Sequence, residues 1–373
     1  MKIPVCEPTL MGNELKYVTE CVKTGWVSSS GKFIQEFEEK FSDYCNAKHG
    51  ASCSSGTAAI HLAIEAMGIG KGDEVIIPTF TMIGACNAVI YAGAKPVLVD
   101  SEMCTWNMDP EKIEEKITKK TKAIMVMHTY GHPCDMDKIK KIAHKHSIPI
   151  IEDAAEAHGA EYNGKKTGSL GDIACFSFYA NKIMTTGEGG MIVTDNKKWA
   201  ENAKSLRNHC FGEPRFLHKK VGYNYRMTNI QAAIGVAQLE KIDEYVEKRR
   251  SNAKLYNKLL NNVKGIKTPP EAKWAKNVYW MYGILANEDF GMSMPKIRDE
   301  LAKNGIETRT FFIGMHKQPA YTAKDERFPD LKGKYPVCDE LQKKGLYLPS
   351  STHLTKEQIT YVANSIKSIK KRL

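Results

Sequence analysis

The sequence of 373 residues has few of the features that mark membrane or secreted proteins. No window contains 18 consecutive apolar residues, so a transmembrane helix is not expected. The opening stretch, MKIPVCEPTL, has an early proline and lacks the apolar region of a secretory signal. No internal repeat or low-complexity linker is present. These absences predict a cytoplasmic protein that makes no use of a membrane.

Paired cysteine motifs are also missing. Ten cysteines are scattered along the chain, and none stands in a CxxC arrangement. This spacing speaks against a zinc ribbon and against a thioredoxin-type pair. Several cysteines lie in apolar strand patterns, where cysteine behaves as a small hydrophobic residue. We therefore predict a reducing compartment and no metal site.

Acidic residues are fewer than basic ones, 43 against 54, and the net charge is +11. A lysine-rich solvated surface explains this excess most simply. An anionic small substrate, such as a nucleotide diphosphate, explains part of it as well. Nucleic-acid binding is the third interpretation, but the sequence has no RNP motif, zinc finger or basic recognition helix. No nucleic-acid partner is expected.

Short apolar runs alternate with helical stretches between residues 50 and 195. Most of these runs are continuous rather than alternating, which favours strands buried on both faces of a mostly parallel sheet. Such alternation predicts an α/β core with helices flanking the sheet. The strand candidates are 73–78, 95–100, 122–128, 148–155, 173–179 and 190–195.

The pattern changes after residue 228. Residues 229–260 have apolar side chains at helical spacing and form a long stretch that could bridge two parts of the chain. A final helix is predicted to begin near Thr355, because Thr355 and Gln358 fit a capping box. Between these helices lie shorter strand candidates, at 278–286, 307–312 and 345–349.

These patterns predict two domains. Residues 1–249 would form a large α/β domain, and residues 250–373 a small α+β domain.

Two polar residues follow buried strand candidates. Lys182 lies just past the run 173–179, at the strand end where open α/β sheets bind their ligands. A partly desolvated lysine can form a Schiff base, because burial lowers its pKa. Asp153 ends another run, and its carboxylate could pair with a protonated pyridine nitrogen. The plain alternatives are a solvated surface lysine and a helix N-cap aspartate.

A phosphate site is indicated where the segment CSSGTAAIHLA leads from a loop into a helix. A helix N-terminus offers free N–H groups to a phosphate, and Gly56 allows close approach of the backbone. An ordinary capped helix is the alternative. Ser177 is either a satisfied core serine or a phosphate ligand. A phosphate-type helix start, a strand-end Asp and a strand-end Lys, in this order, point to pyridoxal 5′-phosphate (PLP).

At these positions the sequence resembles the DegT/DnrJ/EryC1/StrS family of PLP-dependent sugar aminotransferases. Matching stretches run through nearly the whole chain and include SSGTAAIHLA, IEDAAEAHGA, GDIACFSFYANKIMTTGEGG and GYNYRMTNIQAAIG. The lysine motif and the GYNYRMTN motif occur together, which makes the resemblance specific. It implies the aminotransferase fold of type I and transfer of an amino group from L-glutamate, released as 2-oxoglutarate, to a nucleotide-linked keto-sugar.

The resemblance also limits the choice of the keto-sugar that accepts the amino group, but leaves several sugars open. Within the family the sequence is most similar to enzymes that convert GDP-4-keto-6-deoxymannose to GDP-perosamine. The alternatives are a dTDP- or UDP-linked 4-keto-6-deoxyglucose (viosamine type) and a 3-keto sugar. A regulatory protein that binds PLP or a sugar nucleotide without turnover is the alternative outside enzymes. Small differences in contact energy separate such sugars, and one sequence does not reveal them.

The resemblance also implies a role for each matching residue. Lys182 would form the Schiff base and then shuttle protons, and Asp153 would pair with the pyridine nitrogen. Glu156 would lie beside the phenolic oxygen, where many relatives carry Gln. The cofactor phosphate would be bound by Gly56, Thr57, Ser177 and, across the interface of a homodimer with shared active sites, by Asn224 of the partner subunit.

Further residues are expected near the site. Met82 stands where relatives commonly carry an aromatic residue, and its thioether can lie against the cofactor ring. His316, Trp26 and Arg215 are the candidates for substrate contact; Arg215 is otherwise part of a solvated loop.

Two further clusters, one polar and one aromatic, are interpreted as structural rather than functional. The polar residues of MHTYGHPCD (His128, His132, Cys134 and Asp135) match no common zinc spacing and are expected to pack a strand-end loop. The aromatic residues Tyr279, Trp280 and Tyr282 are expected in the core rather than in a base-stacking platform.

Overall fold

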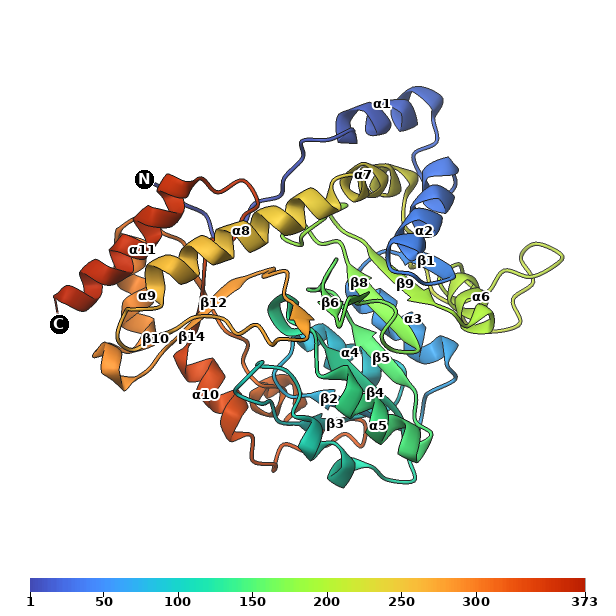
Figure 1. Ribbon diagram of the computed structural model, residues 1–373. Coiled ribbons are helices and arrows are strands. Elements are labelled where there is room, and N and C mark those ends of the chain that lie inside the picture. The colour runs from blue at the N-terminus through green and yellow to red at the C-terminus, as the bar shows by residue number, and fades with distance from the viewer. Residues whose placement is uncertain (373) are drawn as a thin grey trace.

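A seven-stranded sheet forms the centre of the molecule in the computed structural model, which describes residues 1–372 (Figure 1). Its order is β1-β9-β8-β5-β4-β2-β3. The strands from β8 to β3 are parallel, and β9 is antiparallel to both of its neighbours. The strands are β1 (His49–Cys53), β2 (Glu74–Pro78), β3 (Lys95–Val99), β4 (Thr121–Met127), β5 (Ile150–Asp153), β8 (Ile173–Ser177) and β9 (Gly190–Thr194).

Six of these strands confirm the strand candidates between residues 73 and 195. The exception is β1, which the sequence did not indicate, because HGASC contains no β-branched or large aromatic residue. It is held at the sheet edge by antiparallel pairing with β9, from His49 opposite Thr194 to Cys53 opposite Gly190. Tertiary pairing has overridden a weak local preference.

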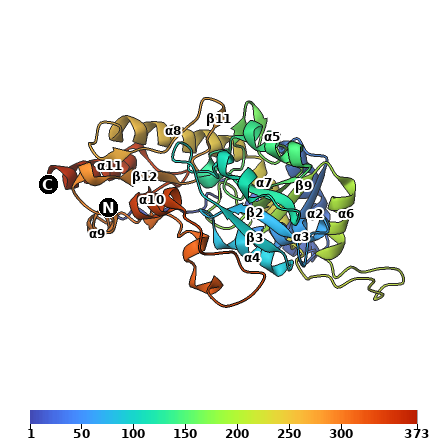
Figure 2. The ribbon, with the colours of Figure 1, turned by 90° about the horizontal axis from the view of Figure 1, so that it is seen from below.

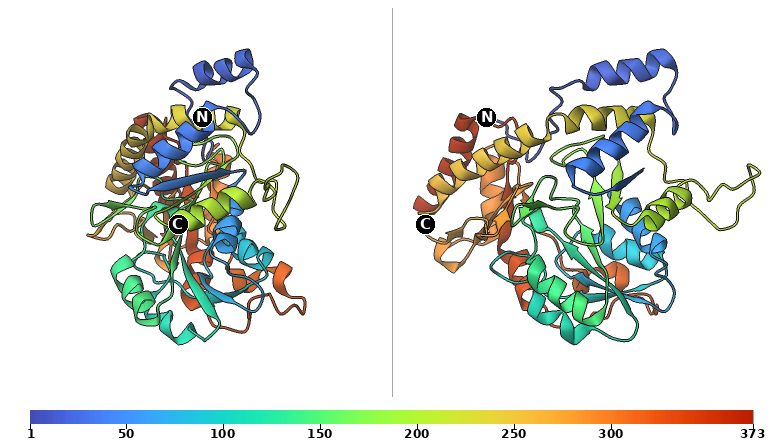
Figure 3. Two further views of the ribbon diagram at one scale, coloured as in Figure 1. Left: turned by 90° about the vertical axis from the view of Figure 1, so that its right-hand side faces the viewer. Right: turned by 45° about the vertical axis from the view of Figure 1, so that its right-hand side comes forward.

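Helices cover both faces of this sheet (Figure 3). On β2, Val75 and Ile77 pack into one core, and Ile76 between them packs into another, together with Ile139 of α5. Because successive side chains of a strand point to opposite faces, a sheet with two cores needs continuous apolar strands. The covering helices are α2 (Lys32–Tyr44), α3 (Gly56–Ala66), α4 (Ile83–Tyr91), α5 (Met136–His146) and α6 (Lys197–Leu206).

A smaller antiparallel sheet, in the order β10-β12-β14-β13, forms the left part of the molecule in Figure 1. Figure 2 shows this part beside the large sheet. Its strands are β10 (Ile266–Lys267), β12 (Tyr282–Ala286), β13 (Arg309–Thr310) and β14 (Gly345–Leu348). The helices near it are α9 (Met294–Lys303), α10 (Pro336–Lys344) and α11 (Lys356–Lys371).

The remaining elements are short. A third sheet has the order β11-β6-β7, with β6 (Glu161–Tyr162), β7 (Lys165–Lys166) and β11 (Ala275–Lys276). The 3-10 helices are η1 (Pro110–Lys112), η2 (Glu114–Lys116), η3 (Thr129–Gly131), η4 (Glu288–Phe290), η5 (Met315–Lys317) and η6 (Pro319–Tyr321). Within residues 1–372, no helix combines the length and the apolar character that crossing a bilayer requires.

The long helical stretch after residue 228 is divided into two helices, α7 (Asn229–Leu239) and α8 (Ile242–Leu260). At the junction Lys241 leaves helical geometry, with φ −116° and ψ 2°, while Asn13 and Tyr17 bind the carboxylate of Glu240. The two helices pack on different partners: α7 on α2 and on α1 (Glu14–Thr24), and α8 on α11. Together they run across the top of the molecule (Figure 1). The domain boundary at 249/250 stays a prediction; it falls inside α8.

The predicted capping box of the last helix is present. The Thr355 hydroxyl accepts the N–H of Gln358 at 3.2 Å, and the Gln358 side chain accepts the N–H of Thr355 at 2.9 Å. These reciprocal bonds satisfy two N–H groups that a helix start would otherwise leave free.

Removing this cap is expected to weaken the fold measurably. Thr355→Ala should lower the free energy of unfolding by about 1 kcal/mol, because one first-turn N–H loses its acceptor. Urea unfolding followed by circular dichroism measures the change. Thr360→Ala, on the same helix, is the control: its hydroxyl bonds only a preceding carbonyl, and alanine has the better helix propensity. Equal stability of Thr355→Ala and the wild type would contradict the contribution of the cap.

Candidate active site

A cavity of 240 Å³ opens at the carboxyl ends of the parallel strands. Met127, Asp153 and Ser177, the last residues of β4, β5 and β8, lie in its wall. This is the edge of an α/β sheet at which ligands are expected to bind. The cavity brings together seven of the residues predicted from the sequence: Gly56, Thr57, Met82, Asp153, Glu156, Ser177 and Lys182.

One end of the cavity is formed by the N-terminus of α3. The side chain of the N-cap residue Ser55 accepts the N–H of Ala58 at 3.1 Å. The helix start is therefore capped, as the alternative interpretation of this segment predicted. The N–H groups of Gly56 and Thr57, in the first turn, have no carbonyl partner within the helix and remain for a ligand. A Cβ on Gly56 would lie 2.6 Å from the Cβ of Ser177, so only glycine lets the helix come this close to β8.

Asp153 lines the cavity and is almost fully buried. No helix begins after it, so it is not a helix N-cap; its carboxylate accepts the N–H of Ala155 at 3.2 Å. Burial raises the pKa of Asp153, and the Ala155 N–H and the charge of Lys182 oppose this rise. A cationic ligand nitrogen next to this carboxylate would stabilise its ionised form.

Lys182 faces Asp153 and Glu156 from the loop after β8. Its side chain is 10% exposed, and its Nζ lies 3.8 Å from the Oε1 of Glu156. Burial lowers the pKa of Lys182, while the negative charges of Glu156 and Asp153 act in the opposite direction. A lysine with a lowered pKa is uncharged more of the time and can attack a carbonyl carbon.

Glu156 is held by the backbone of the neighbouring loop. Its Oε2 accepts the N–H of Tyr130 at 2.8 Å, and Tyr130 adopts a left-handed conformation with φ 53°. Burial raises the pKa of Glu156 to about 7, against the charge of Lys182 and the Tyr130 N–H, which lower it. The carboxyl group therefore changes its charge near neutral pH.

The cavity wall also includes residues that the sequence did not single out as ligands, among them Asn181, Trp280, Phe312 and Tyr347. Asn181 could have been found, since it precedes Lys182 in the lysine motif. Its Oδ1 is buried and, within residues 1–372, has no hydrogen-bond partner, as expected of an atom that awaits a ligand. The three aromatic residues come from the C-terminal part of the chain, and no local pattern connects them with Lys182.

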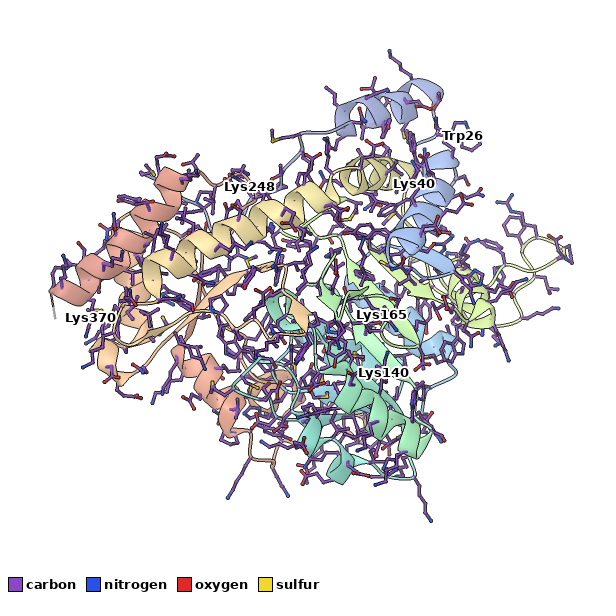
Figure 4. The ribbon with its side chains drawn as sticks, in the orientation of Figure 1. Trp26, Lys40, Lys140, Lys165, Lys248 and Lys370 are labelled. Atoms are coloured by element: carbon purple, nitrogen blue, oxygen red, sulfur yellow. The ribbon has the colours of Figure 1, made fainter. Side chains whose placement is uncertain are left out.

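Four predicted residues lie outside this cavity. Asn224 is exposed and pairs with Asn208 in an isolated bridge. Trp26 is 57% exposed at the end of α1 (Figure 4), and Arg215 belongs to the loop after α6 that projects from the body (Figures 2 and 3). Arg215 lines a separate hollow of 560 Å³ together with Arg207 and Arg226. The roles given to Asn224, Trp26 and Arg215 stay predictions.

His316, the fourth, has both ring nitrogens occupied. Its Nδ1 lies 2.8 Å from the Thr79 hydroxyl, and its Nε2 lies 3.0 Å from the Asp339 carboxylate. The ring also packs on Tyr335. These contacts tie the loop at His316 to the end of β2, and the predicted contact with substrate stays a prediction.

The histidines of MHTYGHPCD have similar internal partners. His128 contacts the Glu152 carboxylate through Nε2 at 3.0 Å and accepts the Cys134 N–H through Nδ1 at 3.1 Å. His132 contacts the carbonyl of Pro133 and accepts the N–H of Ala272. Among residues 1–372, no group of His, Cys, Asp or Glu is arranged to hold a metal ion. The cluster packs a strand-end loop.

The cavity fits PLP at each of its chemical groups. The start of α3 suits the phosphate, the Asp153 carboxylate suits a protonated ring nitrogen, and Lys182 suits the aldehyde. A site of this design is that of a PLP-dependent enzyme with the aminotransferase fold. The comparisons below confirm both the cofactor and the predicted fold class.

The chain belongs to the DegT/DnrJ/EryC1/StrS aminotransferase family, whose model matches residues 8–367. It is 44% identical to a GDP-perosamine synthase of Escherichia coli O157:H7, over 98% of this chain and 97% of that protein. It is 46% identical to a GDP-perosamine synthase of Caulobacter vibrioides, over 99% and 98%. The PLP form of a Streptococcus pneumoniae protein assigned as a sugar aminotransferase superposes with a TM-score of 0.92 at 26% identity, over 100% of this chain and 99% of that chain. The protein is a PLP-dependent aminotransferase.

The titration of Glu156 predicts a pH effect on stability. A carboxyl group whose pKa rises on folding, here from 4.5 to about 7, contributes stability below its unfolded pKa. This contribution is lost as the pH rises through the folded pKa. Between about pH 5 and about pH 8 the wild type should therefore lose more unfolding free energy than Glu156→Gln, which cannot ionise.

Urea unfolding at both pH values measures this difference. Glu247→Gln is the control, because the Glu247 side chain is 63% exposed and its removal should leave the pH dependence unchanged. If Glu156→Gln and the wild type lost equal stability over this range, the raised pKa of Glu156 would be wrong.

Proposed function

We propose that the protein transfers an amino group from L-glutamate to C4 of GDP-4-keto-6-deoxymannose, giving GDP-perosamine and 2-oxoglutarate. The observation that carries the transamination is the meeting of Lys182, Asp153 and the start of α3 in one cavity. The choice of sugar is supported by relatives named GDP-perosamine synthase, which are 44% and 46% identical over nearly their whole length.

In this proposal, two groups of cavity residues hold the cofactor. Gly56, Thr57 and Ser177 would bind its phosphate, and Asp153 would bind its ring nitrogen. When bound, PLP supplies the electron sink that stabilises negative charge beside the transferred nitrogen. Met82 lies in the wall and would contact the ring through its thioether.

Lys182 is the residue proposed to act in catalysis. Its Nζ would hold the cofactor covalently before the donor arrives. Once released, the uncharged amine can accept the proton that leaves the Cα of glutamate and later deliver a proton to the sugar side. Burial favours the uncharged amine by lowering the pKa of Lys182. Glu156, 3.8 Å away, would balance the charge when Nζ is protonated.

A homodimer with shared sites is part of the proposal. The rim of the cavity carries exposed apolar side chains, since Met82 is 50% exposed and Tyr179 is 48% exposed. The projecting loop after α6 adds Phe216 and Val221, which are also exposed. Apolar surface of this kind favours association. Asn224, exposed after this loop, would reach the cofactor phosphate of the other subunit.

The cytoplasm is the proposed location. All ten cysteines are free, and eight of them are buried, which suits a reducing compartment.

Incubation with L-glutamate and a panel of nucleotide-linked keto-sugars tests the acceptor. GDP-4-keto-6-deoxymannose should be aminated at least about tenfold faster than dTDP- or UDP-linked 4-keto-6-deoxyglucose, because the pocket discriminates by contact energy. Liquid chromatography with mass spectrometry measures the amino sugar. Lys182→Ala is the control and should form no product above the level without enzyme. Faster turnover of the dTDP or UDP sugar would replace the proposed acceptor, and full turnover by Lys182→Ala would remove Lys182 from the mechanism.

Mixing two inactive variants tests the shared site. Lys182→Ala and Asn224→Ala should each be inactive or strongly impaired, but a mixed dimer would contain one site with both native residues. The purified mixed dimer should therefore show about half of the activity of the wild-type dimer. Activity is measured after the two proteins are coexpressed and purified through different tags. If the mixed dimer were no more active than either single variant, the contribution of Asn224 across the interface would be contradicted.

A further inference from the structure

The ammonium of Lys182 lies against an aromatic ring as well as a carboxylate. Its Nζ is 3.8 Å from the centroid of the Trp280 ring and 3.8 Å from the Oε1 of Glu156. Trp280 belongs to the segment that leads into β12, so it reaches the cavity from the small sheet. The sequence placed Trp280 in the core, and it is indeed buried, but its ring forms part of the cavity wall.

The Trp280 ring is fixed by a bond to the loop that carries Lys182. Its indole N–H donates to the main-chain carbonyl of Asn181 at 2.8 Å, and the thiol of Cys6 donates to the same carbonyl at 3.3 Å. The ring and the lysine are therefore held together through adjacent residues of one loop.

The backbone of Trp280 is fixed from the other side by Arg249 of α8. This arginine is 3% exposed, and its Nη1 donates to the carbonyls of Trp280 at 2.7 Å and Ser350 at 2.8 Å. The preceding residue, Tyr279, has a left-handed φ of 48° and donates its N–H to the Asn277 side chain at 2.8 Å. A buried arginine and a left-handed residue thus fix the main chain that carries this ring.

We infer that Trp280 is a positioning residue for Lys182, whose free ammonium rests on the face of the Trp280 ring between successive covalent states of the lysine. The inference rests on the proposed function of Lys182. A cation over an indole face is stabilised by the negative face of the ring, and more strongly where water is excluded. The Trp280 ring would thus keep the Lys182 amine near the reacting atoms while the amine is not bonded to them.

Other groups around Lys182 act on the same ammonium. The carboxylates of Glu156 and Asp153 attract it, and Cys6 lies on the N-terminal segment beside the loop. His158 is fully buried, and burial lowers its pKa to about 3, so it stays neutral. Any test of the ring must leave these groups and the cavity volume as they are.

Fluorinated tryptophans meet this requirement. Fluorine withdraws electrons from the ring face, while the size of the indole is nearly unchanged and its N–H is retained as a donor to the Asn181 carbonyl. Tryptophan with one to four fluorine atoms is introduced at position 280 of the full-length protein freed of cofactor. The pKa of Lys182 is measured by competitive acetylation across a pH series, with peptide mass spectrometry.

We expect the pKa of Lys182 to fall stepwise with each fluorine, by about one unit in total, because the ammonium loses the attraction of the ring. The same residues at position 274 are the control. Trp274 packs on His132 and Tyr162 and does not contact Lys182, so fluorination there should leave its pKa unchanged. An unchanged or rising pKa in the series at position 280 would overturn the inference.

A second measurement separates this inference from the proposed function. Borohydride reduction of the enzyme with bound PLP, followed by peptide mass spectrometry, identifies the lysine that is bonded to the cofactor. Cofactor on Lys182 without a fluorine effect overturns the role of Trp280 and leaves the proposed function intact. Cofactor on another lysine overturns the proposed function, and with it the role of Trp280, whatever the fluorine series shows.

Discussion

The removal of Lys182 from water at the end of the parallel strands is the constraint on which the rest of the site depends. Burial lowers the pKa of this lysine, and an amine that is partly uncharged can act as a nucleophile and as a proton carrier. The same burial raises the pKa of Asp153 and Glu156. Burial thus moves the pKa of all three groups toward neutral pH, where proton transfer costs least, while their charges on one another oppose this shift.

Such a cavity needs a rigid frame, because a desolvated charge would otherwise turn toward solvent. The frame comes from two sheets. The large sheet supplies Asp153 and Ser177, which end β5 and β8, and the helix α3 beside it supplies Gly56 at its start. The small sheet and the segment that leads into it supply Trp280 and Tyr347, which complete the cavity wall. The chemistry therefore depends on how the two sheets meet.

Buried polar groups near the cavity hold its loops in place through hydrogen bonds. The Glu152 carboxylate, fully buried, binds His128 and the N–H groups of Gly168, Leu170 and Gly171, and so fixes the loops on either side of β5. His316 fixes the end of β2 in a similar way through Thr79. Buried polar groups with all of their partners present stiffen a structure, because losing a single partner costs the full desolvation energy.

The sequence by itself determined the parallel sheet and the residues at its edge. Continuous apolar runs require a sheet with two covered faces, and Lys182 and Asp153 follow such runs directly. The start of α3 is marked by its own loop-to-helix segment, CSSGTAAIHLA, so local patterns reveal all three. Tertiary structure alone decided the placement of β1, the break between α7 and α8, and the closing of the cavity by Trp280, Phe312 and Tyr347. The physical reason is that these features depend on contacts between segments far apart in the chain, which leave no periodic mark in either segment.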